Sequence, residues 1–169
     1  MNEEKQIYEQ GKESFPAWWI ILENLGFLLN WGLGFIILLP FRFKGLPAAS
    51  LIYLAVLLTF QILLKKHNCT SCYYYGKWCH LGWGKFTSWF FTKDSGKPDL
   101  GMKLAISYIL QLPVLLIAGL IAGFLYEFTI QYIILLAIFA VLNISQALLR
   151  KPSCKRCKAR FGCKGSAAP

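Results

Sequence analysis

The sequence has few charged residues. They make up 15% of its 169 positions, and only eight of them are acidic. An ordinary soluble domain carries about 25% charged residues. Hydrophobic residues account for 56% of the chain, and the mean hydropathy is +0.48. This composition argues against a soluble globular domain and against intrinsic disorder. It favours a membrane protein whose apolar side chains face lipid.

The sequence also lacks the local patterns of the common enzyme classes. It contains no recognisable nucleophile–base pair, no phosphate-binding loop and no dinucleotide-binding fingerprint. We therefore expect no hydrolytic or transferase activity, and the sequence leans away from an enzyme without deciding the question.

Long apolar runs are present in four places. A membrane-spanning helix needs roughly 20 apolar residues. The runs that qualify cover residues 17–39, 48–64, 102–125 and 129–149. Short connections join the first to the second and the third to the fourth. The sequence therefore predicts an all-α integral membrane protein with four transmembrane helices arranged as two hairpins.

An internal repeat supports this division. Residues 61–72 and 146–157 align at an offset of 85, with six of twelve positions identical. The matches include Gln61 with Gln146, Cys69 with Cys154, and Cys72 with Cys157. Two spans return the chain to the same side of the membrane. We therefore expect parallel repeats related by an axis along the membrane normal.

The repeat defines the expected organisation of the chain. Residues 1–16 form an N-terminal tail, 17–82 the first repeat, 83–101 an aromatic helix and loop, and 102–164 the second repeat. Residues 165–169 have the composition of an artificial extension left by cloning. The tail carries four glutamates and lacks the basic start of a signal peptide, so we expect a polar segment that could form a surface helix.

Basic residues indicate the orientation. Apart from Arg42 and Lys44, the lysines and arginines lie in or beside the long loop and the two terminal segments. Basic residues favour the cytoplasmic side of a membrane. We therefore expect both termini and all the cysteines to be cytoplasmic, where thiols are kept reduced.

Six cysteines form two triplets, one at the end of each repeat. They are Cys69, Cys72 and Cys79 in the first, and Cys154, Cys157 and Cys163 in the second. A Cys-x-x-Cys turn presents two thiolates to one ion, and thiolates suit zinc, Cu(I) or an iron–sulfur cluster. We expect bound zinc, with an iron–sulfur cluster as the alternative.

Several ligand sets are open. The two Cys-x-x-Cys pairs could form one four-thiolate zinc site, or two ions could share all six thiolates. His80 could instead join the first triplet in a site of its own, although the second triplet has no matching histidine. Four of the thiolates could also hold an iron–sulfur cluster.

The triplet spacing resembles that of the fungal binuclear zinc-cluster domain. In that family, two cysteine triplets hold two zinc ions through bridging thiolates, and the resemblance implies the same arrangement here. It covers only the cysteine triplets and the basic run after Cys157. The long linker and the membrane spans depart from that family, so DNA binding is not implied.

The loop after the first triplet is rich in aromatic residues. Trp83, Phe86, Trp89 and Phe90 recur at helical spacing, with Lys85, Thr87 and Ser88 off that face. This pattern predicts a short amphipathic helix in the membrane interface, whose lysines favour anionic lipid. A nucleic-acid surface is disfavoured by the high apolar content.

Polar side chains within the spans form a second candidate site. They are Glu23, Asn24, Gln61, Gln111, Asn143 and Gln146. We expect them to form a polar layer beneath the cysteines, with Glu23 either protonated or accepting hydrogen bonds from Asn143 or Gln146. Buried ionisable groups in membranes are costly and often functional, although interhelical hydrogen bonding alone would also explain them.

These features lead to three functional hypotheses. The first is a small zinc-binding membrane protein that acts as a scaffold or accessory subunit. The second is an electron-transfer protein with an iron–sulfur cluster and a quinone contact. The third is a carrier that passes soft metal ions along Glu23 and Asn143. The lipid bilayer and other membrane subunits are the expected partners, nucleic acid is not, and the sequence leaves the oligomeric state open.

Overall fold

The computed structural model describes residues 7–126, 128–161, 163 and 166–168. Within these residues it contains helices and no β-strand. The helical elements are α1 (Ala17–Ile37), α2 (Ala48–Leu64), the π-helical turn η1 (Lys65–Cys69), α3 (Trp83–Phe90), α4 (Pro98–Tyr126) and α5 (Ile130–Lys155). Four helices, α1, α2 continued by η1, α4 and α5, are long and apolar enough to cross a membrane, which confirms the predicted spans.

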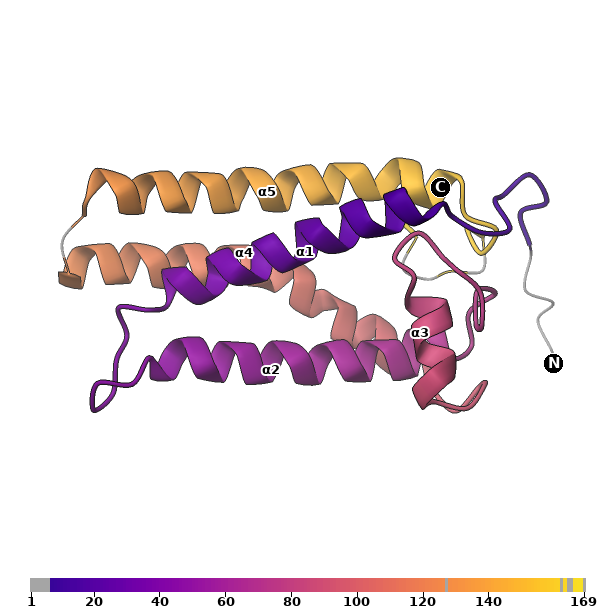
Figure 1. Cartoon of the computed structure of the whole chain (residues 1–169), viewed down its shortest axis with the longest axis horizontal. Coiled ribbons are helices and arrows are strands. Elements are labelled where there is room, and N and C mark those ends of the chain that lie inside the picture. Colours follow the sequence, from indigo (N-terminus) through magenta and orange to yellow (C-terminus); the bar gives the residue numbers. More distant parts are fainter. Residues whose placement is uncertain (1–6, 127, 162, 164–165, 169) are drawn as a thin grey trace.

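The four long helices form an up-and-down bundle (Figure 1). α1 packs against α5, α2 and α4, while α4 also contacts α2 and α5. Both hairpin connections lie at one end of the bundle. The opposite end holds α3, which runs across the bundle axis, together with the N-terminal segment and the end of α5. We call this opposite end the cysteine end.

The bundle has a small buried core and a large apolar surface. Ile37, Leu115, Leu136 and Phe139 form the core, toward the hairpin end. Many large apolar side chains elsewhere are exposed, including Phe124 at 81% of its surface. Such a surface would be unstable in water but suits contact with lipid chains, so the packing agrees with the composition.

α4 bends in its middle (Figure 1), and Pro113 lies inside this helix. Proline lacks the N–H that would bond to the preceding turn, and its ring clashes with that turn. Farther along α4, a side chain at Gly119 would meet Leu136 of α5 at 2.5 Å. The absence of a side chain at this position therefore allows α4 and α5 to pack closely.

Three helical runs extend beyond the predicted spans, and one of them, α4, begins at Pro98 instead of at residue 102. η1 carries α2 on to Cys69, and α5 continues through Pro152 to Lys155, so that it includes Cys154. Ser153, completely buried in this last turn, donates a hydrogen bond to Glu23 of α1 at 2.6 Å. This contact from a distant helix holds a turn that local sequence patterns do not predict.

Candidate functional site

Three segments build the cysteine end. We call residues 69–82 the first cysteine loop, residues 154–163 the second cysteine loop, and residues 7–16 the N-terminal strap. The loops carry all six cysteines, and no disulfide joins any of them. Cys154 is buried, Cys163 is exposed, and the other four are half-buried. The six sulfurs are therefore not committed to one another.

Cys72, in the first triplet, lies near thiols of the second triplet. Burial raises the pKa of its thiol to about 12, with smaller contributions from nearby Cys79 in its own loop and from Cys163 and Cys157 in the other. Burial likewise raises the pKa of Cys157 to about 11, and Cys163 and Cys154 add to the effect. The two triplets therefore come together at one end of the molecule.

The thiols do not form a complete metal site as they stand. Among the residues that the structure describes, no group of three or more Cys, His, Asp or Glu side chains is arranged so that it could hold an ion. The fold thus brings the two triplets close together, but the described side chains are not arranged to coordinate an ion.

Tyr74 joins all three segments. Its side chain is 1% exposed, and its hydroxyl donates to the carbonyl oxygen of Lys12 in the N-terminal strap at 2.5 Å. The same hydroxyl accepts a hydrogen bond from the backbone N–H of Lys158 in the second cysteine loop at 3.0 Å. One buried phenol in the first loop therefore fixes the positions of the other two segments.

The N-terminal strap is bonded to both loops through its backbone. The N–H of Lys12 donates to the Arg156 carbonyl at 2.9 Å, and the N–H of Phe15 donates to the Trp78 carbonyl at 3.0 Å. The surface helix that the polar tail could have formed is therefore absent from residues 7–16, which form turns and extended backbone. Hydrogen bonds to distant loops replace those that a local helix would provide.

Glu13 of the strap connects the two loops by charge. Its carboxylate forms an ion pair with Lys158 of the second loop and accepts a hydrogen bond from Tyr73 of the first at 2.7 Å. Lys77 adds a second ion pair at 3.5 Å. The hydrogen bond from Lys158 is the main cause that lowers the pKa of Glu13 from its usual 4.5 to about 2.

Glu23 makes a corresponding set of contacts deeper in the molecule. Its carboxylate accepts hydrogen bonds from Trp19 Nε1 and Ser153 Oγ, each at 2.6 Å. Its other oxygen lies 2.7 Å from His80 Nδ1. Glu23 thus connects α1 to the end of the first cysteine loop and to the last turn of α5. The expectation that Glu23 bonds to Asn143 or Gln146 is wrong.

His80 is oriented by this contact. It directly follows Cys79, and its Nδ1 is occupied by Glu23. Metal-binding histidines commonly use one ring nitrogen for a carboxylate and the other for the ion. The orientation of His80 is therefore compatible with binding an ion through its other ring nitrogen. The described residues do not, however, place it in a preformed group with the thiols.

The remaining polar residues of the spans do not form a single layer. Asn24 and Gln61 lie near the cysteine end, where Asn24 donates to the Leu81 carbonyl and Gln61 to the Tyr108 hydroxyl. Gln146 lies at a similar depth, beside Gly26 of α1, whereas the other two lie farther along the bundle. Asn143 exchanges two hydrogen bonds with Asn30, and Gln111 donates to Tyr53 at 2.8 Å. The predicted layer is therefore wrong for Asn143 and Gln111, which bond between helices farther along the bundle.

α3 confirms the predicted short helix, and Thr87 is the residue that departs from its expected face. Phe86, Trp89 and Phe90 are exposed by 40% to 64% of their surface, whereas Thr87, expected on the wet face, is fully buried. Gly84 shares the buried face, and a side chain there would meet the Tyr74 carbonyl oxygen at 2.1 Å. The helix therefore docks on the first cysteine loop through its smallest residues.

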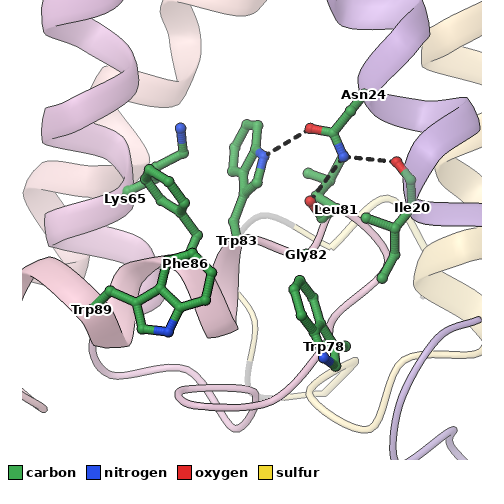
Figure 2. Close-up of a pocket in the computed structure, with 9 residues that line it drawn as sticks. All are labelled: Ile20, Asn24, Lys65, Trp78, Leu81, Gly82, Trp83, Phe86 and Trp89. Carbon is green, nitrogen blue, oxygen red and sulfur yellow. Dashed lines mark hydrogen bonds between the residues drawn. The ribbon is translucent and has the colours of Figure 1, made fainter. Parts of the chain in front are cut away.

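An aromatic cleft of about 290 Å³ lies beside this helix (Figure 2). Ile20 and Asn24 of α1 form one wall, and α3 with Lys65 forms the other. Asn24 bonds to the Ile20 and Leu81 carbonyls and accepts a long hydrogen bond from Trp83 Nε1 at 3.4 Å. The last of these bonds connects Trp83 in one wall to Asn24 in the other.

Tyr74, Glu13 and Ser153 are the site residues that sequence reasoning missed. The tyrosine run at 73–75 and the acidic strap are visible in the sequence. Their partners lie 60 to 145 positions away, however, and no local pattern links them.

Comparison of this chain with known proteins found no match. Neither protein-family models, nor characterised proteins, nor solved structures match this chain. The function must therefore be argued from the residues themselves.

Proposed function

We propose that this chain is a small integral membrane protein that binds zinc through thiolates at its cysteine end. The ion would connect the two helical hairpins, and the protein would serve as a scaffold or accessory subunit. The observation that carries the proposal is the position of Cys72, close to thiols of both triplets, together with the lack of any disulfide.

The chemistry of the residues supports zinc. Zinc takes four ligands in a tetrahedral site, with Zn–S distances of about 2.3 Å, and six thiols are more than one such site requires. Cys72, Cys79 and Cys157 lie outside the long helices, so a change of loop conformation can bring their sulfurs together. A zinc ion with four sulfur ligands has no open position for water. Such a site fits a structural ion better than a catalytic one.

We also infer that the hairpins are parallel repeats and that the cysteine end is cytoplasmic. Cys69 and Cys154, which align in the repeat, each lie in the last turn of the second helix of a hairpin. Gly34 and Gly119 align at the same offset and each lies against a large side chain of a neighbouring helix. The distribution of lysine and arginine supports the orientation.

Metal analysis tests the proposal directly. The full chain, purified anaerobically in detergent, should contain about one or two zinc ions and have no colour, as expected for closed thiolate sites. Cys72→Ser should lower the zinc content at least to half, because this thiol of the first triplet lies near the thiols of the second. Ser95→Ala, an exposed change in the loop after α3, serves as the matched control and should leave the zinc content unchanged.

Two results would contradict the proposal. The first is a preparation with neither zinc nor iron. The second is a Cys72→Ser protein with the normal zinc content. Brown colour with visible absorption that bleaches on reduction would favour the iron–sulfur alternative instead. Uptake of zinc or Cu(I) into liposomes would favour the carrier.

A further inference from the structure

We propose that the aromatic cleft binds one anionic phospholipid, whose headgroup phosphate pairs with Lys65 and whose acyl chain lies along the aromatic rings. The proposal does not use the cysteines. Lys65 lies close enough to Cys69 to interact with it electrostatically, so the zinc content is measured in each Lys65 variant to keep the two proposals distinguishable.

Lys65 supplies the cation. It begins η1, where the second membrane-spanning helix continues toward the first cysteine loop. Its ammonium group lies 4.9 Å from the centre of the Trp83 ring and 5.0 Å from that of Phe86. Lys65 is not a partner in the ion pairs that Glu13 and Glu23 form. Contact with ring faces leaves N–H donors available for an anion.

The cleft around Lys65 is apolar apart from Asn24. Ile20, Trp78, Phe86 and Trp89 supply hydrocarbon or aromatic surface. Asn24 directs its amide to backbone carbonyls and to Trp83, as Figure 2 shows, so its donors are already used. Lys65 is thus the charged group of the cleft, and it favours an anionic ligand. The aromatic rings favour an acyl chain.

The position of the cleft points to a lipid rather than a free anion. α3 lies across the end of the bundle, where the long apolar helices finish. Trp78, Trp89 and Phe90 are exposed there by 44% to 64% of their surface. Aromatic side chains at the end of a spanning helix mark the headgroup region of a bilayer. At that depth, a phosphate is available to Lys65 and acyl chains are available to the rings.

Lipid binding can be measured with defined lipids. Wild-type protein in detergent would be titrated with phosphatidylglycerol, with phosphatidylcholine of the same acyl chains, and with inorganic phosphate. Binding would be followed by native mass spectrometry, with thermal stability as the second readout for the phosphate arm. We expect about fivefold tighter binding of phosphatidylglycerol than of phosphatidylcholine, the ratio for one basic residue at a membrane surface. Inorganic phosphate should give no stabilisation.

Variants assign this preference to the cleft. Lys65→Gln should remove the preference for phosphatidylglycerol, whereas Lys65→Arg should keep it. Lys93→Gln, which removes an exposed charge just after α3, should also keep it. Far-ultraviolet circular dichroism identifies any variant that fails to fold. If Lys65→Gln does not fold, Lys65→Met, which keeps the aliphatic stem without the charge, replaces it and should also lose the preference.

Three results would overturn the proposal. The first is equal binding of the two lipids by wild-type protein. The second is an unchanged preference in Lys65→Gln, which would assign it to the general basic surface. The third is equal stabilisation by inorganic phosphate, which would indicate a free-anion site.

Discussion

Glu23 is the carboxylate shared by three parts of the chain. Trp19 lies one turn before it on α1, His80 follows the first triplet, and Ser153 precedes Cys154. Side chains of Glu23 and His80 are exposed by only 16% and 15%. A buried carboxylate is costly unless its oxygens are hydrogen-bonded, and here both oxygens are. The arrangement therefore stabilises the junction between the bundle and both cysteine loops.

Removing this carboxylate should destabilise the protein. Glu23→Ala leaves the buried groups of Trp19, His80 and Ser153 without their acceptor, which should cost about 2–3 kcal/mol. The expected readout is a lower thermal midpoint in detergent. Glu9→Ala, an exposed change in the N-terminal strap, should leave the midpoint unchanged. An unaltered midpoint in Glu23→Ala would show that these contacts do not hold the loops.

At the scale of elements, α3 depends on a glycine. Gly84 lies on the face that docks against the first cysteine loop, and its own carbonyl accepts a hydrogen bond from Gly76 at 3.0 Å. Added side-chain atoms would meet the backbone carbonyls of Tyr74 and Lys77, which belong to a turn and cannot move aside as a flexible side chain could. Close approach of two backbones explains the residue type at this position.

Gly84→Ala should therefore weaken the docking of α3. Overpacking of this kind typically costs about 1–3 kcal/mol. Thermal unfolding should show a lower midpoint, and protease should cut the loop around α3 faster. Gly32→Ala is the matched control, since Gly32 is also helical and an added methyl group there meets nothing within 4 Å. Equal midpoints for the two variants would contradict the proposed packing.

The N-terminal strap should respond to acid through Glu13. Ion pairing lowers the pKa of this carboxyl from 4.5 to about 2, so its contribution is complete above pH 4.5 and is lost as the pH falls toward 2. Glu13→Gln removes that contribution at every pH.

Near-ultraviolet circular dichroism, to which the buried ring of Tyr74 contributes, can measure this effect. Wild type and Glu13→Gln should differ at neutral pH, and the difference should disappear between pH 4.5 and about 2. A difference that persists at pH 2, or none at pH 7, would show that Glu13 does not position the strap.

At the scale of the whole molecule, the sequence predicts what depends on composition and spacing. Long apolar runs predict the four spans, and the aromatic repeat at 83–90 predicts α3, because helix length and periodicity are local properties. The extension of α5 through Pro152, the strap and the partners of Glu23 could not be predicted. Each depends on side chains brought together from distant positions, such as Ser153 and Glu23.

At the cysteine end, too, some features follow from the local sequence and others depend on distant contacts. The repeat places one triplet after each hairpin, which is enough to predict that the triplets share an end of the bundle. Which thiols are neighbours depends on Tyr74 and the strap, and these contacts place Cys72 near the second loop. The sequence therefore predicts thiols as the ligands. The tertiary contacts determine that Cys72 is the thiol of the first triplet that lies near Cys157 and Cys163.

X-ray absorption at the zinc edge, on the full chain purified anaerobically, would show whether thiolates of the two triplets hold the ion. We expect zinc surrounded by sulfur at about 2.3 Å, with ligands from both triplets, so that Cys72→Ser reduces the sulfur signal. Absence of zinc and of any other soft metal, or zinc bound only by oxygen and nitrogen, would contradict this expectation.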